Sequence, residues 1–310
     1  MRYKKFGRTG LDVSVLGVGT WAIGGDHWGP INDDESIAAI QAMINDGVNL
    51  IDTAPGYNWG HSEQIVGRAV QAFRDKVLIS TKGGIMKPDF ARNSSRAYLF
   101  AEVDRSLANL QTDYIDFYFI HWPDEQTPFE ETMTALEDLR RSGKIRFIGV
   151  SNFNQKQIED ASQYGTVDVL QPPYSMVDRI QEPLLKWSAD QGIATMTYAS
   201  LGAGILSGAH RTIPDFAADD FRMSFYDVFR EPRFSKIQQL LLDMDEIAAK
   251  YRATVGQVAI NWSTQKPFVS TALIGVRSAR HAHENCGGMN WMLTDDEMAY
   301  LDAKIDEYLT

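Results

Sequence analysis

The stretch NLIDTAPGYNWG, residues 49–60, begins as a buried β-strand and ends as a glycine-rich loop. The apolar residues ahead of Asp52 are typical of a strand covered on both faces, as in a parallel sheet. The loop then places the phenol of Tyr57 five residues after the carboxyl group of Asp52. A strand that ends in an acid and runs into such a loop has the form of one β/α unit.

Seven other short apolar runs lie along the chain, many of them rich in β-branched or aromatic residues. They alternate with amphipathic segments of helical length, which favours a parallel sheet whose strands are joined by helices. The eight runs occupy residues 13–19, 48–52, 76–82, 114–121, 145–152, 167–171, 193–198 and 269–275. In a chain of 310 residues they predict one (β/α)8 TIM-barrel domain over residues 1–310, because that α/β fold takes about 250 residues.

Two segments lie outside the eight repeats. Residues 3–16 are predicted to form a β-hairpin ahead of the first barrel strand, with RTGL as the turn. Residues 294–305 are predicted to form an extra C-terminal helix, in which Thr294 and Glu297 make a capping box.

One helix between two barrel strands has clear end signals. Thr127 is its expected N-cap, Pro128 its first-turn proline and Glu130 its capping-box acid, while Gly143 suits the position just past the end.

A dinucleotide-binding Rossmann fold is the alternative to a barrel. GVGTWA, residues 17–22, matches the pattern G-x-G-x-x-G/A. A true fingerprint opens a helix that holds the pyrophosphate, and the following residues, IGGDHWGP, do not suit a helix. The match is therefore interpreted as chance in a glycine-rich loop.

Composition limits the class of protein. A net charge of −11 argues against nucleic-acid or anionic-membrane partners, which require excess Lys and Arg. Cys286 is the only cysteine, so the chain has no internal disulfide. The chain shows neither a signal peptide nor the ~18 apolar residues of a membrane helix. These features predict a soluble cytoplasmic protein.

Polar side chains stand where the predicted strands end, and in a barrel of this type those ends meet at the active-site face. The residues are Asp52, Lys82, His121, Ser151, Asn152, Gln171 and Tyr198. An acid, an amine and an imidazole after three consecutive strands favour a functional site over the ordinary polarity of strand ends.

These groups suit the chemistry of a carbonyl. Asp52 and Lys82 would form a charged pair, and the ammonium would lower the pKa of Tyr57 towards that of a general acid or base. His121 would orient a substrate carbonyl or share in proton transfer. The spacing of His, Asp and Glu matches no metal site. A carbonyl that receives a proton also needs a hydride, which a nicotinamide cofactor supplies.

The chain resembles the aldo-keto reductases in a series of motifs that occur in the same order. The motifs are DTAPGY, STKGG, FIHWPD, GVSNF, YASLGAG and GVRSARHAHEN. The resemblance covers nearly the whole chain and looks especially like bacterial members associated with inositol and sugar metabolism. It implies a (β/α)8 barrel that binds NADP(H), less often NAD(H), and a catalytic tetrad of Asp52, Tyr57, Lys82 and His121.

The resemblance also implies a set of cofactor contacts. Thr20 and Trp21 would lie near the nicotinamide riboside, Asp52 beside the ring, and Tyr198 stacked on it. The carboxamide would be held by Ser151, Asn152 and Gln171. Phosphate contacts would come from Ala199, Leu201, Ala203 and Arg222, and Gly275 would be a further cofactor contact. Arg277, Ser278 and His281 would reach the 2′-phosphate region, and Glu284 and Asn285 the adenine.

The chain departs from the family pattern at three positions. Ala199 replaces a serine that contacts the pyrophosphate, Ala209 a frequent basic residue, and His281 a frequent Arg or Gln. These departures weaken the expectation of a strict NADP(H) preference.

The substrate pocket is expected to be formed by aromatic residues and the tetrad. Its expected residues are Trp21, Tyr57, Trp59, His121 and Trp122. Trp28 and Tyr174 are interpreted with equal weight as pocket walls or as plain surface or core aromatics. A flat aromatic surface suits a sugar ring or a planar carbonyl compound.

Two other functions stay open at this point. The resemblance extends to β-subunits of potassium channels, which would make this chain a cofactor-sensing binding partner with vestigial activity. Lys82 could instead form a Schiff base in an unrelated barrel enzyme. The sequence leaves the physiological substrate and the oligomeric state open.

Overall fold

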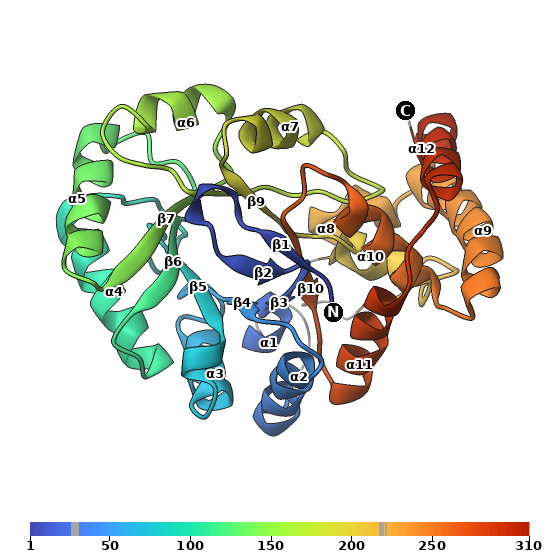
Figure 1. The fold of residues 1–310 in the computed structure, drawn as a ribbon, viewed down its shortest axis with the longest axis horizontal. Helices are drawn as coiled ribbons and strands as arrows, with labels where there is room; N and C mark the ends of the chain where they lie inside the picture. The colour runs from blue at the N-terminus through green and yellow to red at the C-terminus, as the bar shows by residue number, and fades with distance from the viewer. Residues whose placement is uncertain (26–30, 217–219, 221, 310) are drawn as a thin grey trace.

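The computed structural model describes residues 1–25, 31–216, 220 and 222–309 (Figure 1). Its centre is a closed barrel of parallel strands in the order β10-β3-β4-β5-β6-β7-β8-β9, so the predicted fold is confirmed. The barrel strands are β3 (Leu16–Gly19), β4 (Leu50–Asp52), β5 (Leu78–Gly83), β6 (Ile115–Ile120), β7 (Ile145–Ser151), β8 (Val169–Gln171), β9 (Ala194–Thr197) and β10 (Thr271–Gly275).

Helices lie around this barrel; many of them pack apolar residues on it, while others pack in a second apolar cluster beside it (Figure 1). They are α1 (Trp21–Gly24), α2 (Asp33–Asn45), α3 (His61–Val70), α4 (Arg96–Leu110), α5 (Phe129–Arg141), α6 (Gln155–Ala161), α7 (Glu182–Asp190), α8 (Arg222–Phe225), α9 (Arg233–Tyr251), α10 (Val255–Gln265), α11 (Ala279–Gly287) and α12 (Asp295–Leu309). No helix in the described part of the chain is long and apolar enough to cross a membrane.

The predicted hairpin covers the amino end of the barrel. Strand β1 (Tyr3–Lys5) pairs antiparallel with β2 (Asp12–Ser14), and in Figure 1 they lie across the barrel opening. Phe6, between them, is fully buried and packs on Phe117 with ring centroids 5.1 Å apart. The hairpin thus closes one end, which leaves the carboxyl ends of the strands as the accessible face.

The helix ends partly match the sequence signals. At α12, Thr294 and Glu297 each accept the other's backbone N–H, at 3.2 and 3.0 Å, so the predicted capping box is confirmed. The predicted start of α5 is wrong: Pro128 is the N-cap and no side chain caps the helix. The Thr127 hydroxyl donates instead to Asp124 Oδ2 at 2.6 Å.

Gly143 and the GVGTWA stretch have the structures that the sequence predicts. Gly143 has φ +80° just past α5, as expected of a residue that ends a helix. The GVGTWA stretch leads from β3 into α1, a helix of four residues that stops at Gly25 with φ +85°. So short a helix does not form the dinucleotide fingerprint.

Tyr174 is a core aromatic rather than a pocket wall. It is fully buried and stacks on Trp262 with ring centroids 5.4 Å apart, and both belong to a second apolar cluster that includes residues of α9, α10 and α12. Trp28 lies outside the described residues.

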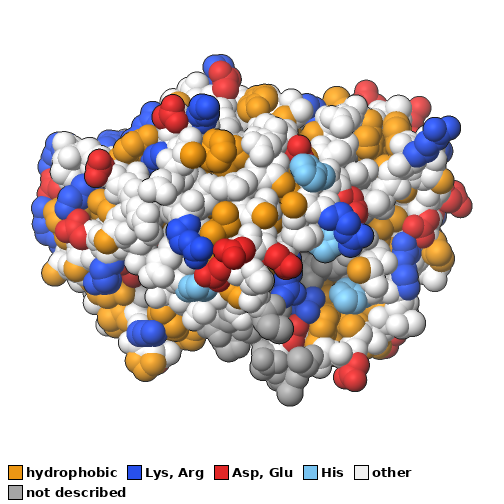
Figure 2. Space-filling view, turned by 90° about the horizontal axis from the view of Figure 1, so that it is seen from below, with side chains coloured by type: hydrophobic (Ala, Val, Ile, Leu, Met, Phe, Trp, Pro, Cys, Tyr) orange, Lys and Arg blue, Asp and Glu red, His pale blue; other side chains and the backbone are white. Residues whose placement is uncertain are grey.

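Acidic and basic side chains are interspersed over the face shown in Figure 2, where the described residues form no continuous basic surface.

Candidate active site

Neighbouring strands bring Asp52 and Lys82 into a buried ion pair. Asp52 is the last residue of β4 and Lys82 the last but one of β5, and the two strands pair side by side. Lys82 Nζ donates to Asp52 Oδ2 at 2.7 Å and to the Thr53 carbonyl at 2.9 Å. The Lys82 side chain is only 1% exposed and the Asp52 side chain only 3%. A buried charge requires such partners, because burial without them costs several kcal/mol.

The second oxygen of Asp52 is also held. Oδ1 accepts hydrogen bonds from the Ser80 hydroxyl at 2.7 Å and from Gln171 Nε2 at 2.9 Å. The carboxylate is therefore fixed by β5 and β8 as well as by the lysine, and its orientation towards Lys82 is set by the barrel.

Tyr57 completes the cluster from the loop after β4. Lys82 Nζ donates to the Tyr57 phenol oxygen at 3.1 Å. The backbone of Gly24 lies so close that a Cβ there would come within 3.1–3.3 Å of Tyr57 atoms. Asn58 Nδ2 donates to the Gly24 carbonyl at 2.9 Å, so α1 and the loop fix the tyrosine together.

The pKa of Tyr57 differs from the expectation. The sequence predicts a lowered pKa beside the lysine, whereas burial of the phenol, followed by the nearby Asp52 charge, raises the pKa well above 10. The phenol is consequently protonated at neutral pH, as a proton donor must be. The ammonium of Lys82 stabilises the phenolate that forms once the proton has left.

His121 follows β6 and faces the tyrosine edge-on. Its ring centroid is 6.0 Å from that of Tyr57, and its backbone N–H donates to the Gly83 carbonyl at 2.9 Å. Burial, and then the charge of Lys82, lowers the pKa of His121 well below 6.5. The imidazole is therefore neutral, with one N–H to donate to a substrate oxygen.

The three residues expected to hold a carboxamide lie together beside this cluster. Ser151 Oγ donates to the Gln171 carbonyl at 2.8 Å, and Asn152 Nδ2 donates to the His121 carbonyl at 3.0 Å. Tyr198 donates its hydroxyl hydrogen to Asn152 Oδ1 at 2.9 Å, and burial raises its pKa. Hydroxyl and amide groups suit a carboxamide, so these residues fit a nicotinamide ring.

Trp21 and Thr20, the two residues expected near the riboside, make different contacts. Trp21 stacks on Tyr57, with centroids 6.1 Å apart and an interplanar angle of 23°. Thr20 is fully buried, and its hydroxyl donates to the Asp52 carbonyl at 2.8 Å. Its hydroxyl oxygen also accepts a hydrogen bond from the Ser62 hydroxyl of α3 at 2.7 Å, so the side chain joins β4 to that helix.

The expected phosphate residues follow β9. Ala199, Ala203 and Gly204 have φ of 55°, 57° and 98°, and η3 (Gly202–Ser207) is kinked there. Consecutive backbone turns of this type suit anions through their N–H groups. Leu201 opens this turn.

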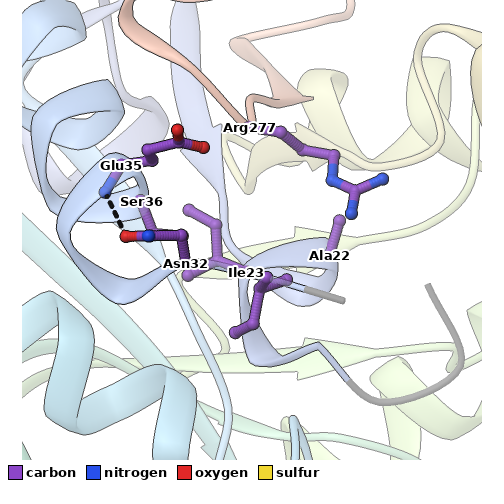
Figure 3. A pocket seen from close by; sticks show the side chains of 7 residues that line it. Ala22, Ile23, Asn32, Glu35, Ser36 and Arg277 are labelled. Atoms are coloured by element: carbon purple, nitrogen blue, oxygen red, sulfur yellow. Dashed lines mark hydrogen bonds between the residues drawn. The ribbon is translucent and has the colours of Figure 1, made fainter. Parts of the chain in front are cut away.

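Two arginines expected at the phosphates have acidic neighbours. Arg222 forms a two-pronged contact with Asp220, from Nε at 2.9 Å and from Nη2 at 2.5 Å. The pKa of Asp220 is lowered mainly by its hydrogen bonds to Arg222 and further by the charge of Arg277. Figure 3 shows Arg277 at a cavity that it lines with Glu35 of α2.

The adenine-side residues lie on or beside α11. Ser278 is the N-cap of α11 and accepts the His281 N–H at 3.3 Å, while Gly275 ends β10. The Glu284 carbonyl accepts a hydrogen bond from Gln257 at 2.6 Å, and Asn285 is partly exposed. All of the adenine-side residues lie on β10, on α11 or between the two.

Sequence reasoning missed two neighbours of Tyr57, Gly24 and Tyr226, and also Phe90, which lies beside Trp59. Gly24 ends the short helix α1 and Phe90 lies in a loop, and neither belongs to a chemical motif. Tyr226, at the N-cap of the short helix 227–229, has its pKa raised to about 12 by burial and by Tyr57. Close contacts of this kind depend on the fold, and no spacing signal marks them.

Within the described residues, no group of three or more His, Cys, Asp or Glu side chains is placed to hold a metal ion. Burial raises the pKa of the lone thiol, Cys286, to about 12. That thiol is consequently protonated and unreactive at neutral pH.

Known proteins similar to this chain share its length and fold. The model of the aldo/keto reductase family matches residues 15–306. An aldo-keto reductase of Bacillus subtilis (strain 168), YhdN, is 35% identical over 100% of this chain and 95% of its own length. An NADH-specific methylglyoxal reductase of Escherichia coli (strain K12) is 34% identical, with 95% of both chains covered. The structure of the glycerol dehydrogenase AKR11B4 from Gluconobacter oxydans superposes with a TM-score of 0.88, at 33% identity and with 96% of this chain and 93% of that one covered.

Proposed function

This chain belongs to the aldo/keto reductase family, and we propose that Asp52, Tyr57, Lys82 and His121 are its catalytic residues in the interconversion of a carbonyl and an alcohol. The observation that carries the proposal is the contact chain from Asp52 through Lys82 Nζ to the Tyr57 phenol, at 2.7 and 3.1 Å. It ends in a protonated phenol beside a cation, which is the pairing that general acid catalysis of carbonyl reduction needs.

Each residue has a separate task in reduction. Tyr57 donates its proton to the carbonyl oxygen and becomes a phenolate, which the Lys82 ammonium stabilises. Asp52 holds that ammonium in place. His121, neutral because it is buried, donates a hydrogen bond that orients the oxygen. In oxidation of the alcohol the phenolate of Tyr57 accepts the proton.

A nicotinamide dinucleotide would be held by Ser151, Asn152 and Gln171 at the ring and by the turn after β9 at the phosphates. When bound, its nicotinamide supplies the hydride for reduction or accepts it for oxidation. The polar groups of those residues meet the tetrad at one end of the barrel, which supports this placement.

We infer a preference for NADP(H) over NAD(H). Arg277 stands next to the N-cap of α11, where a guanidinium and free N–H groups suit a phosphate. Glu35 and Asp220 moderate this preference, because each brings a carboxylate near Arg277. The NADH-specific relative shows that the family also contains the opposite preference.

An assay of reduced-nicotinamide absorbance tests both the activity and the cofactor. NADPH and NADH are compared with methylglyoxal, glyceraldehyde, aldoses, inosose and aromatic aldehydes, and oxidation with glycerol and inositols. Turnover of at least one carbonyl with a higher kcat/KM for NADPH supports the proposal. Cofactor binding with no turnover of any of these compounds would favour the regulatory alternative. The single domain over residues 1–310 and the cytoplasmic location stay predictions.

A further inference from the structure

A hairpin extends directly from the strand that carries Lys82. This β5–α4 hairpin spans residues 84–93, and its two arms are joined by hydrogen bonds from Met86 N to the Ala91 carbonyl at 2.8 Å and from Asn93 N to the Gly84 carbonyl at 3.1 Å. At its base, Gly84 N donates to Glu102 Oε2 at 2.7 Å. The catalytic strand and the α4 helix therefore hold the hairpin at the active-site face.

Aromatic contacts join the tip of the hairpin to the catalytic loop. The Phe90 ring lies 5.1 Å from that of Trp59, and Trp59 follows Tyr57 by two residues. Both aromatic residues have left-handed backbones, with φ of 60° and 51°. Bulky residues rarely adopt this conformation, and it concentrates at functional sites. Phe90 is also 52% exposed, so its ring is available to a ligand.

Two cations of the hairpin lie on the aromatic rings beside the tetrad. Lys87 Nζ is 5.0 Å from the centroid of Trp59, and Arg92 Cζ is 5.1 Å from the centroid of Trp122, the residue after His121. Among the described residues, neither cation forms an ion pair or a side-chain hydrogen bond. Both are exposed.

Two acids of the adjoining loops are already engaged. Asp89 Oδ1 accepts the Ala91 N–H at 3.2 Å. Asp124 Oδ2 accepts from Ser94 N at 2.8 Å and its Oδ1 from Gln126 N at 2.9 Å. Their charges offset part of the local positive charge, but neither carboxylate pairs with Lys87 or Arg92.

We propose that Lys87 and Arg92 bind an anionic group on the substrate, a carboxylate or a phosphate at the end away from the carbonyl that reacts at Tyr57. This inference rests on the proposed reductase function and names its substrate class. The chain carries a net charge of −11, so its overall field opposes an anion. A local pair of cations at the mouth overcomes this field at short range, and the aromatic rings next to them pack on the body of the substrate.

The test uses substrates that differ in charge but share the reacting aldehyde. In the carboxylate arm, 4-carboxybenzaldehyde is compared with its methyl ester; in the phosphate arm, glyceraldehyde 3-phosphate is compared with glyceraldehyde. The variants are Lys87→Gln, Arg92→Gln and the double variant. Arg141→Gln is the matched control, because Arg141 is exposed and pairs with Asp138 at the end of α5, on the opposite face of the barrel.

The wild type is expected to prefer at least one anionic member of the two pairs. In the double variant, kcat/KM for that anion falls about tenfold through KM, whereas the neutral partner changes less than about twofold. The control keeps the wild-type ratio. The preference also weakens as the ionic strength rises towards about 0.3 M, because exposed charges are screened. The arm that shows the effect identifies carboxylate or phosphate.

Equal kcat/KM for charged and neutral partners in both arms, or an anion preference that the double variant retains, would overturn the inference while the reductase function stands. Failure to reduce any aldehyde would instead count against the proposed function. Calorimetric titration with 4-(hydroxymethyl)benzoate, the alcohol product, needs no turnover. If the carboxylate arm shows the kinetic effect, the same affinity in wild type and double variant would count against the cation site by itself.

Discussion

Replacing Asp52 by Asn removes the charge that holds Lys82. The amide keeps the size of the side chain, and its oxygen can still accept from Ser80 and Gln171, which now lie 2.7 and 2.9 Å from Oδ1. Its NH2 group, however, meets Lys82 Nζ, so that a donor faces a donor. Burial already lowers the pKa of Lys82, and Asp52 is the first group that opposes this shift. In the variant Lys82 therefore loses its proton.

The magnitude follows from that neutral amine. A lysine that is forced to be neutral at pH 7, against an ordinary pKa near 10.4, costs about 4.6 kcal/mol at 1.36 kcal/mol per pH unit. This agrees with the roughly 3–5 kcal/mol for breaking a buried pair. Because the unfolded state binds the extra proton, the stability of the variant rises with pH up to about 10.4. Without the cation the Tyr57 phenolate is less stable, so kcat falls about 100-fold at pH 7.

The assay measures kcat for carbonyl reduction between pH 6 and 10, together with urea unfolding followed by circular dichroism. Asp34→Asn is the matched control, because that side chain is 91% exposed and forms an ion pair with the Arg68 guanidinium, at 3.5 Å, far from the tetrad in the sequence. A folded Asp52→Asn protein with kcat within about threefold of wild type at every pH would refute the role of the ion pair.

Two further changes test the surroundings of the tetrad. Burial raises the pKa of Glu102 from 4.5 to about 7. The folded state therefore favours the protonated acid, and wild-type stability falls as the pH rises from 4.5 to 7. Glu102→Gln keeps partners for Gly84 N and the Tyr98 hydroxyl. Urea unfolding should therefore show the variant up to about 3 kcal/mol more stable than wild type at pH 8 and equal to it at pH 4. A difference in unfolding free energy that stays the same at every pH would contradict this. Gly24→Ala places a Cβ 3.1–3.3 Å from Tyr57 atoms. The variant should have a kcat about tenfold lower, because the phenol is displaced, and an unchanged cofactor affinity. A wild-type kcat would show instead that the loop shifts without moving the phenol out of position.

The sequence predicted the barrel and the strand-end residues because both follow from local patterns. Runs of apolar residues define the strands, and the polar residue after each run must lie at the mouth once the strands are parallel. That logic places Asp52, Lys82 and His121 correctly without any knowledge of their contacts. The capping box of Thr294 and Glu297 was predictable for the same reason, since its signal lies within four residues.

Features that depend on burial or on long-range contacts could not be predicted in this way. The sequence shows a lysine near Tyr57 and so indicates a lowered pKa; it does not show that the phenol is buried, which reverses the shift. The predicted start of α5 was wrong because the Thr127 hydroxyl has another partner, Asp124, which competes with the helix for it. The contacts of Lys87 and Arg92 with tryptophans from other loops exist only in the folded chain.

The central claim is that Tyr57 transfers the proton while its neighbours tune and orient it. Tyr57→Phe removes one oxygen atom and leaves the ring stacked on Trp21, so the measurement is kcat for reduction beside the Kd for NADPH, found by fluorescence titration. The account predicts a kcat at least about 100-fold below wild type with a Kd within about twofold. A variant that reduces carbonyls at nearly the wild-type kcat would contradict it.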